Sequence, residues 1–301
     1  MIRHTWNHIR PLTRQQRFFY VLAAIFALST VVHAVVAAVA LFSGESWSGP
    51  ISWRKPVVFA ASFALLMLAM AWVLRHLPER RWGWIPTGML GGFSIIEVAV
   101  ITLQQWRGEP SHFNNHTPFD DAMFGIMGGS VGLIIVSIVV FLVWVCLQFR
   151  GNGAERLAVI VGLVSVLVAG YIGGSMIAEG EAVLAATDDV PYEVVFGAAG
   201  SGKLAHFLGL HTLQFLALIA IVAPSRNRLK IVTIGAVGYL ALFASVTFTA
   251  YAGLGWLAPP LPLGLLGIAG LAVATGVAIT TMRAFRADSM LVETRVLTTV
   301  G

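Results

Sequence analysis

Two histidines and one glutamate lie inside long apolar runs, where ionisable side chains are rare. They are His33, Glu97 and His211. An ionisable group within a membrane-spanning helix is costly, and it usually faces other helices or a water-filled cavity. Two imidazoles and one carboxylate that leave coordination positions open can hold non-haem iron or catalytic zinc. The three residues therefore predict a metal site, provided that the elements that carry them place them at one depth.

The expected elements are transmembrane helices. Of the 301 residues, 57% are hydrophobic and 11% are charged, whereas about a quarter are charged in a soluble domain. Apolar runs of roughly 20 residues, each long enough to cross the hydrocarbon core, recur along the chain. We predict an all-α polytopic bundle that forms one domain over residues 1–301. The eight spans are expected at about 18–43, 56–77, 85–106, 119–149, 155–178, 203–223, 228–253 and 261–285.

The distribution of Lys and Arg predicts the orientation of these spans. With both termini in the cytoplasm, fifteen basic residues fall inside and four, Arg54, Lys55, Arg107 and Lys203, fall outside. This split follows the positive-inside rule. The net charge of +5 therefore reflects topology and does not indicate nucleic-acid binding. Tryptophans are expected at both interfaces, Trp47, Trp53, Trp106 and Trp256 outside and Trp82, Trp84 and Trp144 inside.

The predicted span ends place the three buried ionisable groups at one depth. His33 lies ten residues from the outer end of its span, Glu97 nine and His211 eight. At about 1.5 Å per residue, all three lie roughly 12–15 Å below the outer surface. His206 stands near the mouth of the sixth span. We therefore predict that iron, zinc or copper is bound by His33, Glu97, His206 and His211.

The connection "QQWRGEPSHFNNHTPFD", residues 104–120, gathers polar residues at the outer end of the third span. Thr117, Pro118 and Asp120 are typical of a helix start. Phe113 favours burial, so residues 107–116 are predicted to fold back over the bundle. The predicted catalytic residues are Glu97, His112 and Asp120. Those expected to bind a cofactor or substrate are Arg54, Arg107, Gln104, which shares a helix face with Glu97, and Gln214, which shares one with His211.

The stretch "GAAGSGK", residues 197–203, is close to a phosphate-binding loop but lacks the pattern that such a loop requires. Leu204 stands where Ser or Thr is needed, and no strand precedes the stretch. The single cysteine, Cys146, excludes an internal disulfide.

Four motifs, "GPISWRKPVVFAASF" (49–63), "QQWRGEPSHFN" (104–114), "TPFDDAMF" (117–124) and "KLAHFLGLHTLQ" (203–214), resemble a family of bacterial multipass membrane proteins. The resemblance covers most of the chain. It implies a location in the bacterial inner membrane, and it implies that His112, His206 and His211 belong to the family signature. It implies no activity.

Three functions fit these predictions. The first is a metal-dependent enzyme that acts on a lipid or another hydrophobic small molecule, with the metal activating oxygen or water. The second is an electron-transfer protein in which histidines on facing helices ligate a b-type haem. The third is a proton-coupled transporter that uses Glu97, although neither repeat symmetry nor broken helices are evident. A homo-oligomer fits any of the three.

The topology can be tested with reporter fusions. Fusions at residue 190 and at the C-terminus should report opposite sides of the membrane, because the first lies in a predicted outer loop and the second in the basic cytoplasmic tail. Reports from the same side would show that the number of spans is wrong.

Overall fold

The computed structural model describes residues 13–188 and 201–300 of the chain. Within these residues the regular structure is helical, and eight helices are long and apolar enough to cross a membrane. The chain is therefore an integral membrane protein with an all-α fold, as its composition predicts.

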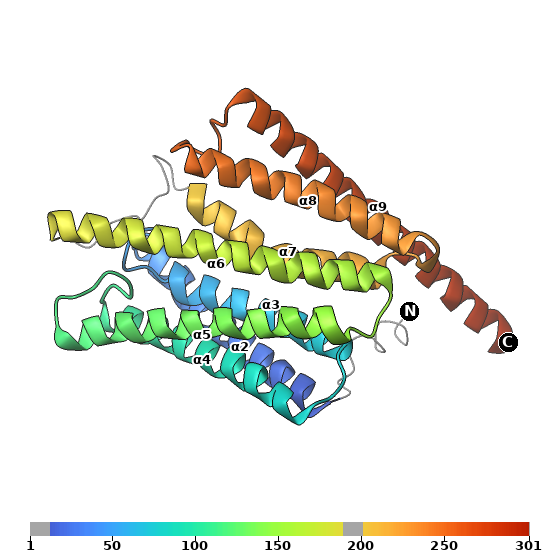
Figure 1. The fold of residues 1–301 in the computed structure, drawn as a ribbon, viewed down its shortest axis with the longest axis horizontal. Helices are drawn as coiled ribbons and strands as arrows, with labels where there is room; N and C mark the ends of the chain where they lie inside the picture. The colour runs from blue at the N-terminus through green and yellow to red at the C-terminus, as the bar shows by residue number, and fades with distance from the viewer. Residues whose placement is uncertain (1–12, 189–200, 301) are drawn as a thin grey trace. The chain divides into compact units, whose positions relative to one another are not determined.

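The helices agree with the predicted spans in number and, for the most part, in length (Figure 1). They are α2 (Arg14–Phe42), α3 (Arg54–Arg75), α4 (Trp84–Arg107), α5 (Pro118–Gln148), α6 (Gly153–Thr187), α7 (Ser201–Val222), α8 (Arg228–Tyr251) and α9 (Leu261–Val300). The short 3-10 helices η1 (Arg81–Gly83) and η2 (Ser225–Asn227) precede α4 and α8.

Two helices continue well beyond the predicted spans. The spans were expected to end near residues 178 and 285, but α6 extends to Thr187 and α9 to Val300. The added residues are rich in Ala, Leu, Glu and Arg and contain no proline, so they favour a helix without being apolar. Membrane thickness sets the length of the apolar run, while helix propensity sets where the helix ends.

The chain divides into two compact units. The single domain expected over residues 1–301 stays a prediction. Of the described residues, the amino-terminal unit holds 13–144 and 173–188, and the carboxy-terminal unit holds 145–172 and 201–300. The helix α6 contributes residues to both units.

In the amino-terminal unit, α4 is held closely against α2. A Cβ atom on Gly91 would lie 2.5 Å from the ring of Phe18 and 2.6 Å from Leu22, so a larger residue would force these side chains to shift. The helices α2 and α3 also pack along one another, with the rings of Phe26 and Phe63 5.9 Å apart. This packing fixes the face that α4 turns inward.

Close approach at small residues also holds the carboxy-terminal unit together, as is typical of membrane helices. A Cβ atom on Gly162 of α6 would lie 2.6 Å from the backbone of Leu213 in α7. The helices α8 and α9 lie side by side (Figure 1), and Gly270 of α9 approaches the carbonyl oxygen of Gly238.

Candidate functional site

The inward face of α4 carries the polar residues of the candidate site. Glu97 is 2% exposed and Gln104 is fully buried, with Ile101 between them on the same face. The predictions that Glu97 faces the interior and that it shares a face with Gln104 are therefore confirmed. Contact between Glu97 and the first or sixth span stays a prediction.

Glu97 is buried without the partners that a buried carboxyl normally has. Its Oε2 atom is inaccessible to solvent and makes no hydrogen bond within the described part of the chain. Burying an unpaired polar group costs free energy, and burying an unpaired charge costs much more. An orphaned group of this kind calls for a functional explanation.

An apolar layer lies above Glu97 along α4. It comprises Val100, Ile101 and Met127, which are buried, with Phe59 and Met123 packed against them. Ile101 is one helical turn from Glu97 and about one turn from Gln104. The layer therefore separates the Glu97 carboxyl from the polar groups at the end of α4.

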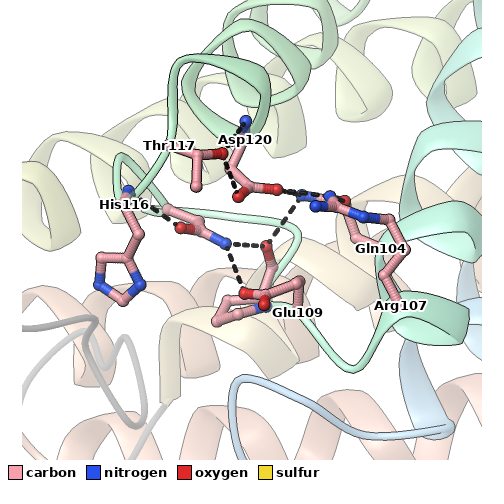
Figure 2. A network of polar contacts seen from close by, with 8 residues as sticks. Gln104, Arg107, Glu109, His116, Thr117 and Asp120 are labelled. Carbon is pink, nitrogen blue, oxygen red and sulfur yellow. Dashed lines mark hydrogen bonds and ion pairs between the residues drawn. The ribbon is translucent and has the colours of Figure 1, made fainter.

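Those polar groups form a network centred on the carboxylate of Asp120, which is 1% exposed (Figure 2). Gln104 donates to Asp120 Oδ1 at 2.8 Å, and Arg107 Nη1 donates to the same oxygen at 2.5 Å. Arg107 also donates to the side-chain oxygen of Gln104, and its guanidinium lies 4.6 Å from the ring centre of Phe119. The network joins the end of α4 to the start of α5.

The start of α5 follows the predicted pattern. The backbone N–H of Asp120 donates to Thr117 Oγ1 at 3.1 Å, so Thr117 caps the helix, and Pro118 is its first residue. Thr117 in turn donates to Asp120 Oδ2 at 2.6 Å. Asp120 is thus part of the helix cap and of the network at once, which explains its burial as an ion.

The loop 108–117 packs against the amino-terminal unit, and Phe113 is buried as predicted. That residues 107–116 cover the mouth of the whole bundle stays a prediction. Gly108 ends α4 in the left-handed conformation. Phe113 is 5% exposed and has a φ of 59°, rare for a residue other than glycine. A Cβ atom on Gly180 of α6 would lie 2.4 Å from the ring of Phe113. Asn114, fully buried, donates to Glu109 at 3.3 Å and to the carbonyl of Pro110 at 3.2 Å.

His112 lies half-buried among aromatic rings. Its ring centre is 6.0–6.2 Å from those of Phe59, Phe113 and Phe124. Its Nδ1 is 3.0 Å from Ser111 Oγ, to which Lys55 donates at 3.4 Å. Burial, and to a lesser extent the positive charge of Lys55, lower the pKa of His112 from 6.5 to about 3, so its imidazole is neutral at physiological pH.

His33 is held by hydrogen bonds at both ring nitrogens. Its Nδ1 donates to the carbonyl of Ser29 at 2.8 Å, and its Nε2 accepts from Trp106 Nε1 at 3.2 Å. The ring of Trp53 stacks against it. The Nδ1 bond lies within α2, whereas the bond from Trp106 joins α2 to α4 and occupies the Nε2 lone pair.

The remaining predicted residues lie elsewhere in the fold. His206 donates from Nδ1 to the carbonyl of Ala169 at 2.7 Å, and the ring of His211 lies 4.4 Å from that of Phe207. Gln214 is 2.9 Å from the carbonyl of Leu210 when its amide is oriented to donate. All three belong to the carboxy-terminal unit, whereas Arg54, half-buried at the start of α3, belongs to the amino-terminal unit.

The described residues contain no group of three or more His, Cys, Asp or Glu side chains that could hold a metal ion. Of the four predicted ligands, His33 and Glu97 lie in one unit and His206 and His211 in the other.

Two features of the site were missed at the sequence level. Ser111, which links Lys55 to His112, was not identified because a loop serine carries no distinctive signal. Trp106 and Trp53 were recognised only as interfacial residues, although they also contact His33. A tryptophan nine residues after a buried glutamate on α4 gives no indication of its partner on α2.

Comparisons with known protein families, with characterised protein sequences and with solved structures find no match for this chain.

Because Asp120 is the centre of the network, its substitution should destabilise the fold more than that of any other carboxylate near the loop. Asp120→Asn should lower the free energy of unfolding by about 2–4 kcal/mol, because it removes the charge that Arg107 and two neutral donors share. The neighbouring Asp121 is exposed, so Asp121→Asn should cost no more than about 0.5 kcal/mol. Unfolding in denaturing detergent measures both, and equal losses would contradict the central position of Asp120.

His112 predicts a pH dependence with a definite sign. Its pKa in the folded chain is about 3, below its ordinary 6.5, so on acidification the unfolded chain takes up the proton first. Stability is therefore full above about pH 6.5 and falls as the pH falls toward 3. Between pH 7 and pH 5 the wild type should lose roughly 2 kcal/mol more than His112→Asn.

The control for this measurement is His116→Asn, because His116 is exposed. It should follow the wild type through the same pH range. A His112→Asn variant that loses as much stability as the wild type would contradict the burial of a neutral imidazole.

Proposed function

We propose that this integral membrane protein binds and releases a proton at Glu97, and that it works as a proton-coupled carrier. The family resemblance implies a location in the bacterial inner membrane, and on the topology predicted from Lys and Arg the loop 108–117 faces outward. The observation that supports the proposal is the orphaned carboxyl of Glu97, 2% exposed and without a partner for Oε2 within the described residues.

A proton is the simplest occupant of such a group. A protonated carboxyl is neutral, so burial costs far less than for the carboxylate. Ionisable residues within membrane spans commonly mark proton relays in pumps and transporters. A protein site for a non-haem metal normally supplies three or more ligands, and in the described part of the chain no group of three candidate ligands is found.

In the proposed carrier, the apolar layer closes the path between Glu97 and water on the side of the loop. With Ile101 fully buried and Met127 2% exposed, the layer covers Glu97 on the side of the loop. A dewetted apolar constriction is a barrier to protons and ions. In this conformation Glu97 keeps its proton, and release requires a rearrangement that admits water to the carboxyl from one side of the membrane.

Above the layer, the loop-end network supplies polar groups for proton exchange with water. Gln104 and Asp120 are buried there, and Arg107 is partly exposed. The Arg107–Asp120 ion pair neutralises this entrance, so a proton passing it meets no net charge. Release of the pair would separate α4 from α5, which together carry most of the apolar layer.

Carbodiimide labelling tests the proposal. Dicyclohexylcarbodiimide partitions into membranes and modifies protonated carboxyl groups in apolar surroundings. Mass spectrometry of the labelled full-length chain should find the modification at Glu97. Labelling should decrease as the pH rises, because ionised carboxylates do not react. Glu97→Gln should lose the label, whereas Glu45→Gln, a matched change at an exposed loop residue, should keep it.

The carrier step has its own readout in sealed proteoliposomes. For a group with alternating access, the labelling of Glu97 should respond to the pH on each side of the membrane. A response to one side alone would reduce Glu97 to a fixed proton site and overturn the carrier. Absence of pH-dependent labelling would overturn proton binding as well.

A further inference from the structure

Three chain segments meet at the end of the amino-terminal unit opposite the loop 108–117. They are the start of α2, the end of α3 and the turn that leads through η1 into α4. Gln15 donates from its amide to the carbonyl of Arg80 at 3.0 Å, and Gln16 donates to the carbonyl of Ala71 at 3.2 Å. Both glutamines are 1% exposed. These buried bonds give the turn around Arg80 and Arg81 a fixed position.

Aromatic side chains pack against this turn. Trp144 is 2% exposed, and its ring centre lies 4.4 Å from that of Trp82. A Cβ atom on Gly83 would lie 2.5 Å from the ring of Trp144. The ring of Trp84 stands 5.8 Å from that of Phe18. Trp82 and Trp84 remain 44% and 41% exposed, so they form a surface.

Four exposed arginines belong to the same two segments as these contacts, the start of α2 and the turn before α4. Arg14 and Arg17 are exposed on the first turn of α2, and Arg80 and Arg81 are exposed at the turn. Within the part of the chain that the structure describes, none of the four forms an ion pair. The carboxylate nearest to them in sequence is the exposed Glu79, so positive charge predominates. We call the surface formed by Arg14, Arg17, Arg80, Arg81, Trp82 and Trp84 the arginine rim.

We propose that the arginine rim binds the phosphate of an anionic phospholipid headgroup. The guanidinium fork matches phosphate in geometry and charge. Basic residues at the end of a membrane helix attract anionic lipid, and indole rings favour the headgroup level. On the predicted topology the rim faces the cytoplasmic leaflet.

The surroundings of the rim favour a lipid over a soluble phosphate compound. Ile85, next to Trp84 on the first turn of α4, is 64% exposed, and Val21, one turn beyond Arg17 on α2, is 58% exposed. In a membrane protein these apolar side chains face acyl chains. A ligand that contacts both the arginines and this apolar surface needs a charged head and a hydrocarbon tail.

The test compares two lipids with the same acyl chains. The full-length protein in neutral detergent is titrated with phosphatidylglycerol or with phosphatidylcholine, and bound lipid is counted by native mass spectrometry. The wild type should prefer phosphatidylglycerol, and salt should weaken this preference. Arg80→Gln combined with Arg81→Gln should weaken phosphatidylglycerol binding about fivefold for each charge removed, about 25-fold in all.

The control is Lys203→Gln, which removes one positive charge from the predicted outer side, near the start of α7, and should leave binding unchanged. Equal binding of the two lipids by the wild type would overturn the proposal, whether or not the double variant folds. So would a loss in Lys203→Gln equal to the loss per charge in the double variant. Competition by glycerol 3-phosphate at the concentration at which the lipid binds would assign the rim to a soluble phosphate instead.

Discussion

The cost of a carboxyl group without a partner inside an apolar helix bundle is the constraint on which the amino-terminal unit depends. Glu97 lies on the inward face of α4, and this helix approaches α2 closely at Gly91. Turning Glu97 outward would expose an ionisable group to lipid, which is also costly. The unit therefore keeps the carboxyl inside, and the apolar layer around Ile101 separates it from the loop end.

The fold provides hydrogen-bond partners for a second buried carboxylate, which stands at the start of α5 next to the end of α4. Asp120 accepts hydrogen bonds from Gln104, Arg107 and Thr117, and it is as deeply buried as Glu97. Partners for a buried carboxylate are thus available two turns away. Since an unsatisfied polar group lowers stability, the lack of a partner for Glu97 Oε2 in the described residues is better explained by function than by a failure of packing.

Apolar run length and helix-start chemistry are local properties, and the sequence therefore predicted the eight spans and the Thr117 cap well. Depth along a helix is also local, so Glu97 was placed inside correctly. Depth alone does not give direction around the helix axis. His33 shares the predicted depth of Glu97, yet its ring is hydrogen-bonded to Ser29 and to Trp106. Partners on other helices, including those of His112 and Gln104, depend on tertiary packing that spacing does not encode.

The two ends of α4 differ in a way that bears on how Glu97 could meet water. At the loop end, the buried polar groups of Asp120 and Asn114 bond to neighbours within the same short region. At the other end, buried glutamines hold the helix starts in place while the arginines point outward. If lipid holds the rim, the motion that the proposed carrier needs to admit water to Glu97 is expected at the loop end. There, among the described residues, the Arg107–Asp120 ion pair and a few hydrogen bonds join α4 to α5, and entering water would replace them.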